Sequence, residues 1–151
     1  MIILDVDTAA RLVHRLQQLR ADARPRWGKM SAHQMVCHLH DTMQLAMGER
    51  TTEDASTAVS RTVFRWMALR APLPWPKNYP TRPEFDQLAR GTQPGDFGRD
   101  VLRLGDGFRR MARRPRDFDF GRHPVFGEMT EWEWMRWAYL HAEHHFRQFG
   151  I

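Results

Sequence analysis

Four stretches of the sequence place apolar side chains three and four residues apart, which is the spacing of one face of an α-helix. These stretches are 7–20, 31–47, 96–114 and 130–149, and a weaker one covers 55–70. No stretch alternates apolar and polar residues in the way that a half-buried β-strand does. The pattern therefore predicts an all-α protein in which amphipathic helices bury their apolar faces against one another.

The stretch between the second and third strong helices is long and rich in proline. Five prolines between Pro72 and Pro83 favour an extended, semi-rigid connection. A length of 151 residues is sufficient for one domain with a sizeable core. We therefore expect a single domain over residues 1–151, built as a four-helix bundle with a long, partly helical crossover between core helices 2 and 3.

Helix-capping residues mark several boundaries in the sequence. Asp7 is the expected N-cap of the first helix. Ser31 and Thr130 each precede a Gln or Glu by three residues, which is the pattern of a capping box. Gly150 follows the last helical stretch, where a glycine commonly ends a helix. The helix that runs from Thr130 to Gly150 is therefore the most strongly signalled one.

Arginine supplies nearly all of the positive charge behind the net charge of +5. The densest patch, residues 109–116, lies at the end of an expected helix, where arginine complements the helix dipole. Several aspartates lie close to it in the sequence. A solvated helix face explains the patch better than a phosphate-binding surface, so we expect no nucleic-acid partner.

Two further features bear on the cellular compartment. No apolar run approaches the roughly 18 residues that would span a bilayer, so we expect no membrane partner. Cys37 is the only cysteine, which precludes an intrachain disulfide and is typical of a reducing environment. The sequence thus indicates a cytoplasmic protein.

The last helix carries three histidines within five residues, His141, His144 and His145. At 100° per residue they share one arc with two tryptophans, on the face that has to turn inward. His141 and His145 are four residues apart, so one helix can offer both imidazoles to a single metal ion. A zincin-type protease needs a Glu directly after the first His, whereas Glu143 comes two positions later and points off this face.

Two histidines leave a metal under-coordinated, so a third ligand has to come from another helix. The second helix offers His33, His38 and His40, which lie on the two shoulders of its apolar stripe. Helix geometry gives no preference between these shoulders. The alternative is that the histidines are buried, hydrogen-bonded packing residues or form an exposed pH-sensitive face.

Several motifs together resemble the DinB/YfiT-like superfamily of metal-binding helical bundles, and more narrowly a bacterial branch catalogued as a domain of unknown function. These motifs are WGKMSAHQMVCHLHD at 27–41, PWPKNYPTRPEF at 74–85, HPVFGEMT at 123–130 and HAEHHFRQFG at 141–150. The resemblance spans most of the chain. It implies a four-helix bundle and often a homodimer, which the Trp and Met content of this chain permits.

The superfamily site consists of one histidine from the second helix and two from the last. Carried over by motif, the resemblance implies metal ligation by His38, His141 and His145. It leaves His33 and His40 as surface residues. His144 has no implied ligand role; it is a weak catalytic candidate that either orients a substrate or carries a proton, or else packs at the edge of the bundle.

Three neutral imidazoles suit Zn²⁺ or Ni²⁺, and also Fe²⁺ or Cu²⁺, better than Mg²⁺ or Ca²⁺. A three-histidine site leaves open positions, which is the catalytic pattern. Metal-activated water would give a hydrolase, whereas a metal-bound low-molecular-weight thiol would give a thiol S-transferase, as the resemblance implies. We therefore expect a metal-dependent enzyme that acts on a small molecule. The competing hypothesis is a non-catalytic bundle for oligomerisation or partner binding, with a structural or vestigial metal.

Supporting roles are assigned by position alone. Gln34 and Gln148 each share a face with an expected ligand, so they are candidates to hydrogen-bond its outer nitrogen. Candidate acid–base residues are chosen only by their closeness in the sequence, and they are Glu128, Glu131, Glu133 and Glu143. The turn at His123 and Pro124 either closes the end of the bundle near the site or simply caps it.

Overall fold

The structure is a computed structural model that describes all 151 residues, and it is entirely helical. Its elements are α1 (Val6–Leu16), α2 (Ala32–Ala46), the π-helical turn η1 (Ser60–Phe64), α3 (Arg65–Arg70), the 3-10 turn η2 (Pro83–Phe85), α4 (Phe97–Ala112) and α5 (Glu131–Phe149). Extended pairing is limited to one isolated bridge between His123 and Gly127. The predicted all-α class is confirmed.

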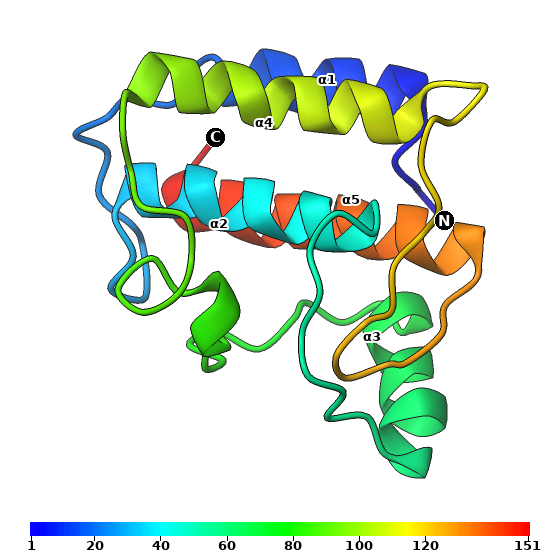
Figure 1. Cartoon of the computed structure of the whole chain (residues 1–151). Helices are drawn as coiled ribbons and strands as arrows, with labels where there is room; N and C mark the ends of the chain where they lie inside the picture. Colours follow the sequence, from blue (N-terminus) through cyan, green and yellow to red (C-terminus); the bar gives the residue numbers. More distant parts are fainter.

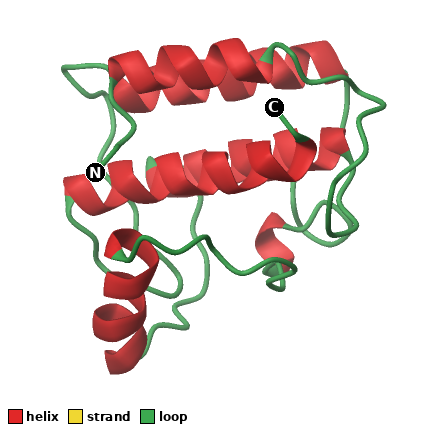
Figure 2. Cartoon of the chain, turned by 180° about the vertical axis from the view of Figure 1, so that it is seen from behind, coloured by secondary structure: helices red, strands yellow, loops and turns green.

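The four longest helices lie side by side in two layers (Figures 1 and 2). One layer holds α1 and α4, and the other holds α2 and α5. The segment between α2 and α4 runs along the outer side of the second layer, with α3 at one end and η2 near α2 (Figure 1). The core lies where the apolar stripes of the four helices meet, and it includes Leu12, Leu39, Phe108 and Trp134, all less than 2% exposed.

The expected caps form, with one correction. The Ser31 and Thr130 side chains accept from the backbone three residues on, and both capping boxes are complete. Gly150 ends α5 with a φ of 76°, a left-handed conformation that glycine adopts without strain. The prediction of Asp7 as the first N-cap was wrong, because Asp5 accepts the Thr8 N–H at 2.8 Å and α1 begins two residues earlier.

The weaker helical stretch at 55–70 is helical only from residue 58, and it includes the π-helical turn η1. Leu69 joins the core, whereas Val59, Val63, Phe64, Trp66 and Met67 are 47% to 58% exposed. Most of the apolar residues in this stretch therefore form an exposed surface.

The arginine patch at 109–116 is a solvated face, as expected. Its side chains form ion pairs with carboxylates on the same helix and on neighbouring segments, including Arg109 with Asp106 and Arg113 with Asp117. Arg116 pairs with Glu131 at 3.1 Å.

Each helix of the structure is either too short or too polar to cross a membrane.

The buried carboxylate of Asp41 anchors the connecting segment to α2. It is completely buried and accepts from the Thr92 backbone N–H at 2.8 Å and from the Thr92 hydroxyl. Gln87 donates to it at 3.1 Å, and the Arg50 guanidinium lies 3.0 Å away. A charge buried this deeply is stabilised only when such partners surround it. Residues 50–92 are thereby fixed at both ends of their path over α2.

We expect Asp41→Ala to lower the free energy of unfolding by roughly 3–5 kcal/mol, because it leaves the Arg50 charge and the Thr92 donors without a partner. Chemical denaturation measures this loss, and hydrogen exchange at the Thr92 amide should rise with it. Asp22→Ala is the matched control, since the Asp22–Arg20 pair is fully exposed and screened by solvent, and its loss should leave the stability nearly unchanged. Equal stability of the two variants would contradict an anchoring role for Asp41.

Candidate metal centre

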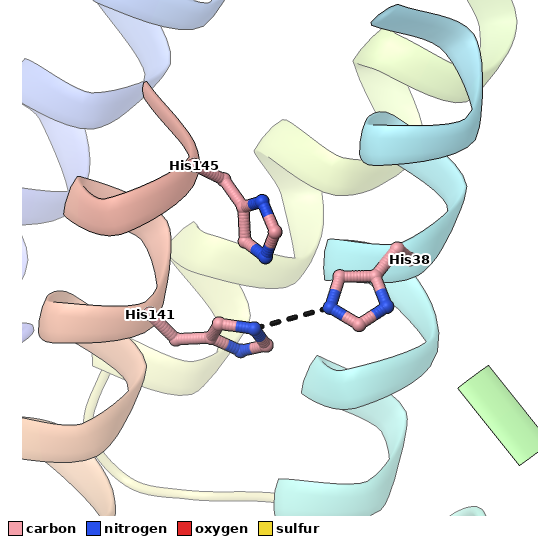
Figure 3. Close-up of side chains that lie close together, drawn as sticks. All are labelled: His38, His141 and His145. Atoms are coloured by element: carbon pink, nitrogen blue, oxygen red, sulfur yellow. Dashed lines mark hydrogen bonds between the residues drawn. The ribbon is translucent and has the colours of Figure 1, made fainter. Parts of the chain in front are cut away.

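Three histidines converge between α2 and α5. His38 comes from α2, and His141 and His145 come from successive turns of α5 (Figure 3). Their ring centroids form a nearly equilateral triangle with sides of 5.0, 4.9 and 4.9 Å. One nitrogen of each ring lies within 4.8 Å of the other two, so the three residues form a group that could hold a metal ion.

The period of the α-helix explains how α2 and α5 bring these side chains together. Residues 141 and 145 are four apart, so their rings stand one above the other on the inward face of α5. His38 lies beside Leu39, on the shoulder of the α2 stripe that faces α5. All three side chains are 5% to 9% exposed. Burial between the two helices therefore separates them almost completely from bulk water.

A carbonyl group fixes the tautomer of His38. Nδ1 of His38 lies 2.9 Å from the Phe85 carbonyl oxygen. A carbonyl only accepts hydrogen bonds, so Nδ1 carries the hydrogen and Nε2 is left with a lone pair. Nε2 points toward the other two rings (Figure 3). The η2 turn, which contains Phe85, thus orients a side chain of α2.

An amide group fixes the tautomer of His145 in the same way. Gln148 donates through Nε2 to the Trp27 carbonyl oxygen at 2.8 Å, so its Oε1 turns toward His145. Nδ1 of His145 lies 2.8 Å from that oxygen and donates to it. The prediction that Gln148 supports a histidine is confirmed. Gln34 does not do so, because its side chain accepts from the Ser31 backbone in the capping box.

His141 completes the set through a hydroxyl group. Thr42 donates its hydroxyl hydrogen to the Leu39 carbonyl oxygen at 2.9 Å, so its oxygen is available as an acceptor. Nδ1 of His141 lies 3.4 Å from this oxygen, a longer contact than the other two. The outer nitrogens of His38 and His145 are therefore held by close acceptors, which leaves a lone pair on each Nε2, whereas His141 meets its acceptor only at the limit of hydrogen-bond distance.

This arrangement fits a cation at the centre. Nε2 of His38 and Nε2 of His141 are 3.1 Å apart, so a hydrogen on Nε2 of His141 can bridge them, as the dashed line in Figure 3 marks. A metal at the centre would need that hydrogen on Nδ1 of His141 instead, where the Thr42 oxygen lies 3.4 Å away. Metal–nitrogen bonds of about 2.0–2.1 Å in a tetrahedral site put two donors about 3.3 Å apart. The spacing of the rings and the identity of the donors thus match a transition metal.

Burial also keeps these imidazoles neutral. It lowers the pKa of His38 and lowers those of His141 and His145 well below 6.5, because a charged ring loses its hydration here. The neighbouring histidines add to the effect at His141. The lone pairs are therefore available to a metal at neutral pH.

Aromatic side chains surround the triad. Trp137 lies 4.7 Å from His141 and Trp75 lies 5.8 Å from it, measured between ring centroids. Trp75 comes from the proline-rich segment and also faces His144 at 6.2 Å. A surface cavity of about 790 Å³ lies elsewhere, lined mainly by α1 and α4 and by part of α2, and none of the three histidines lines it. The partly exposed residues in ring contact with the triad are thus Trp75 and His144.

The remaining predicted residues lie outside the triad. His144 is half-buried at its edge, with Trp27 at 5.7 Å. His123 is buried under the turn before α5, where its Nδ1 accepts the N–H groups of Val125 and Phe126. The four glutamates offered as acid–base candidates form ion pairs instead, as Glu128 with Arg122, Glu131 with Arg116, Glu133 with Arg65 and Glu143 with Arg15. None is therefore free to serve the triad.

A second group of potential ligands lies on the other side of α2, and sequence reasoning missed it. His33 is half-buried there rather than on the surface, with Nε2 2.8 Å from Asp100 Oδ2. Cys37 lies one turn along, with Sγ 3.8 Å from the same oxygen. Burial, together with the charge of Asp100, raises the pKa of this thiol to about 12. The spacing of His33 and Cys37 was visible in the sequence, but their partner on α4 was not.

The buried neutral histidines predict a loss of stability in acid. Burial lowers the pKa of His123 to about 3, whereas the unfolded chain titrates near 6.5. Between these values only the unfolded state binds the proton, so each lowering of pH favours unfolding by up to about 1.4 kcal/mol per pH unit. In chelator-treated protein, His123→Asn should flatten the slope of unfolding free energy against pH.

Denaturant titrations of wild type and His123→Asn at several pH values between 7 and 4 measure that slope. Because the slope counts protons, it does not depend on how much the substitution itself weakens the fold. An identical slope in wild type and His123→Asn would contradict the assignment of a neutral His123.

The comparisons with known proteins identify one family. A family model described as "Protein of unknown function (DUF1569)" matches residues 2–150. Searches of curated proteins and of solved structures returned no match. The matched region includes both helices that carry the three histidines, and it leaves out only the first and last residues. The chain therefore belongs to the DUF1569 family of proteins of unknown function.

Proposed function

We propose that this protein is a metal-dependent enzyme that acts on a small molecule, with His38, His141 and His145 as its metal ligands. The observation that carries the proposal is the convergence of three buried imidazoles, each with an acceptor near its outer nitrogen and with its inner nitrogen turned toward a shared centre. Packing histidines have no need of this polarity, because any hydrogen-bond partner on either nitrogen would satisfy them. Metal-binding histidines need it, since the outer hydrogen bond orients the ring.

We also propose that the four long helices form a four-helix bundle of the DinB/YfiT-like kind, with the proline-rich segment as the crossover. Its support is the pairing of α1 with α4 and of α2 with α5, and the placement of the histidines on α2 and α5. In that superfamily the resemblance implies one ligand from the second helix and two from the last. The three histidines that cluster in this chain are divided between α2 and α5 in the same way, which supports the proposal.

Zn²⁺ and Ni²⁺ are the metals that we expect, with Fe²⁺ as a further candidate, because imidazole nitrogens suit them. When bound, the metal lowers the pKa of a coordinated thiol or water and makes it a nucleophile. The protein's own residues hold the site in place and restrict water. Trp75 and Trp137 cover the triad, and half-buried His144 lies where it can accept or deliver a proton at the edge.

Hydrolysis and thiol S-transfer both fit the site, because they make the same demand on its residues. Each needs a side chain that moves a proton at the reacting water or thiol, and histidine is the residue that most often does so. All four glutamates near α5 are engaged in ion pairs with arginines. Half-buried His144 is therefore the proposed proton carrier in either reaction, with water as the nucleophile of a hydrolase and a low-molecular-weight thiol as that of a transferase.

A non-catalytic role is the alternative, and one observation favours it. The exposed face of η1 and α3, formed by Val59, Val63, Phe64, Trp66 and Met67, suits a protein partner or a second copy of the chain. The two roles differ in what His38→Ala does. An enzyme loses turnover with little loss of stability, whereas a structural site loses several kcal/mol when its metal is lost.

Metal content tests the proposal directly. Wild type purified without an affinity tag or chelator should contain about one metal ion per chain at the triad, as measured by elemental mass spectrometry. His38→Ala and His145→Ala should lose that ion while circular dichroism shows an intact helical fold, and exposed His14→Ala should keep it. A wild type that is metal-free and fails to take up Zn²⁺ or Ni²⁺ would overturn the proposal.

Gln148 provides a finer test, because it contacts the site only through His145. We expect Gln148→Leu to weaken metal affinity by roughly 10–100-fold, the usual effect of losing an outer hydrogen bond. Gln148→Glu keeps an acceptor oxygen for His145 but loses the donor to Trp27, so it should bind nearly as tightly as wild type. Competition titrations against a chelator measure both. Unchanged affinity in the Leu variant would show that this hydrogen bond does not support the metal.

A further inference from the structure

A second cluster of ligand atoms lies between α2 and α4, apart from the three-histidine site. His33 and Cys37 stand one turn apart on α2, and Asp100 reaches them from the first turn of α4. One nitrogen, one sulfur and one carboxylate oxygen lie within 4.8 Å of one another. Cys37 and Asp100 are buried, and His33 is half-buried. Three different donor types therefore converge on one point at this helix interface.

The donors suit a thiophilic divalent ion. Thiolate, imidazole and carboxylate are the ligands that Zn²⁺ takes in proteins, and the two anionic groups would neutralise its charge. Sγ of Cys37 and Oδ2 of Asp100 are 3.8 Å apart, close to the about 3.6 Å expected for a sulfur and an oxygen in a tetrahedral site. Nε2 of His33 and Oδ2 are 2.8 Å apart, so they need to separate by about half an ångström.

The surroundings hold the cluster and leave it accessible. The Gly95 N–H donates to Oδ2 of Asp100 at 3.1 Å, and Arg103 lies 3.4 Å from Oδ1, so the carboxylate is fixed from two sides. A pocket of about 340 Å³ opens onto Cys37 and Asp100, with His40 and Arg103 among the other lining residues. An ion can therefore reach the cluster, and a water molecule has room to complete its coordination.

We propose that His33, Cys37 and Asp100 form a second metal site, which takes Zn²⁺ or a similar divalent transition ion. On binding, the S–H bond of Cys37 is exchanged for a sulfur–metal bond, and its proton leaves to solvent. The hydrogen that Nε2 of His33 donates to Asp100 is given up to solvent while Nδ1 takes one from solvent, so that Nε2 binds through its lone pair and Asp100 contributes one oxygen. No electron is transferred. The proposal does not rest on the function assigned to the three-histidine site, because the two clusters share no residue.

This site would tie α2 to α4 across the two layers. The helix α2 carries both clusters, with His38 on the side toward α5 and with His33 and Cys37 on the side toward α4. A metal at the second cluster links two helices that are 67 residues apart at His33 and Asp100. Metal bound to the folded state alone stabilises it by mass action. The expected consequence is a more heat-resistant protein.

Cobalt titration tests the site, because Cys37 is the only cysteine of the chain. A thiolate bound to Co²⁺ gives a near-ultraviolet charge-transfer band, which three imidazoles cannot give. Metal-free full-length protein titrated with Co²⁺ should develop this band and bind a second equivalent beyond the one at the triad. Cys37→Ser should lose the band and the second equivalent. The midpoint of thermal unfolding should rise with that equivalent in wild type only.

Two further sets of variants separate this site from the triad. His38→Ala and His145→Ala should keep the band even if the proposed enzyme function is wrong, since they leave the second cluster intact. Asp100→Asn and His33→Gln should weaken the Co²⁺ affinity, as followed by the charge-transfer band, by at least about tenfold. Asp106→Asn, an exposed position on the same helix, and His14→Gln are the matched controls and should behave as wild type.

The outcomes that overturn the proposal are specific. A correctly folded wild type that saturates with Co²⁺ without the charge-transfer band shows that the cluster is only a hydrogen-bonded carboxylate. A band that persists unchanged in both Asp100→Asn and His33→Gln shows that Cys37 binds cobalt without them, and also rejects the site. Because wild type alone gives the first result, the test stands even if Cys37→Ser fails to fold.

Discussion

The anchor of Asp41 on the connecting segment is the interaction on which the candidate site depends. The fully buried carboxylate of Asp41 contacts Arg50, Gln87 and Thr92, so the connecting segment is held against α2 on both sides of η2. Phe85, the last residue of η2, presents its carbonyl to His38, which lies one turn before Asp41 on α2. A buried charge tolerates few arrangements of its partners, because each missing hydrogen bond is expensive in a low-dielectric interior. The position of Phe85, and with it the tautomer of His38, follows from that restriction.

The packing of the protein orients the three-histidine centre. A backbone carbonyl, a hydroxyl and an amide each lie at one outer nitrogen, and together they turn the three Nε2 atoms toward a shared point. Burial lowers the pKa of these imidazoles, so the rings are uncharged at neutral pH and suit a cation as ligands. The connecting segment and residues 26–28 are thereby linked to the chemistry proposed for the site, since one holds His38 and the other holds Gln148, the partner of His145.

The helix α2 presents different ligand types on the two sides of its apolar stripe, and one side faces α5 while the other faces α4. Toward α5 it presents one imidazole beside the two imidazoles of α5, and a three-histidine set of this kind leaves coordination positions of a bound metal open. Toward α4 it offers an imidazole and a thiol to a carboxylate, a set that suits a link between helices. The aromatic cover of Trp75 and Trp137 lies over the first shoulder only. The two clusters therefore differ in what they can do: one is suited to a reacting small molecule and the other to holding helices together.

The sequence by itself determined the helices, their inward stripes and the pair His141 and His145, because these are local properties set by a period of 3.6 residues and by capping side chains. The choice of His38 among three histidines needed the resemblance to a family, since helix geometry allowed both shoulders. Only the tertiary structure decided that Phe85 and Thr42 lie at the outer nitrogens of His38 and His141, that Asp100 joins His33 and Cys37, and that Trp66 and Met67 of α3 lie exposed while Leu69 is buried. These are contacts between residues far apart in the chain, and they depend on which helix faces pack together, which no local pattern encodes.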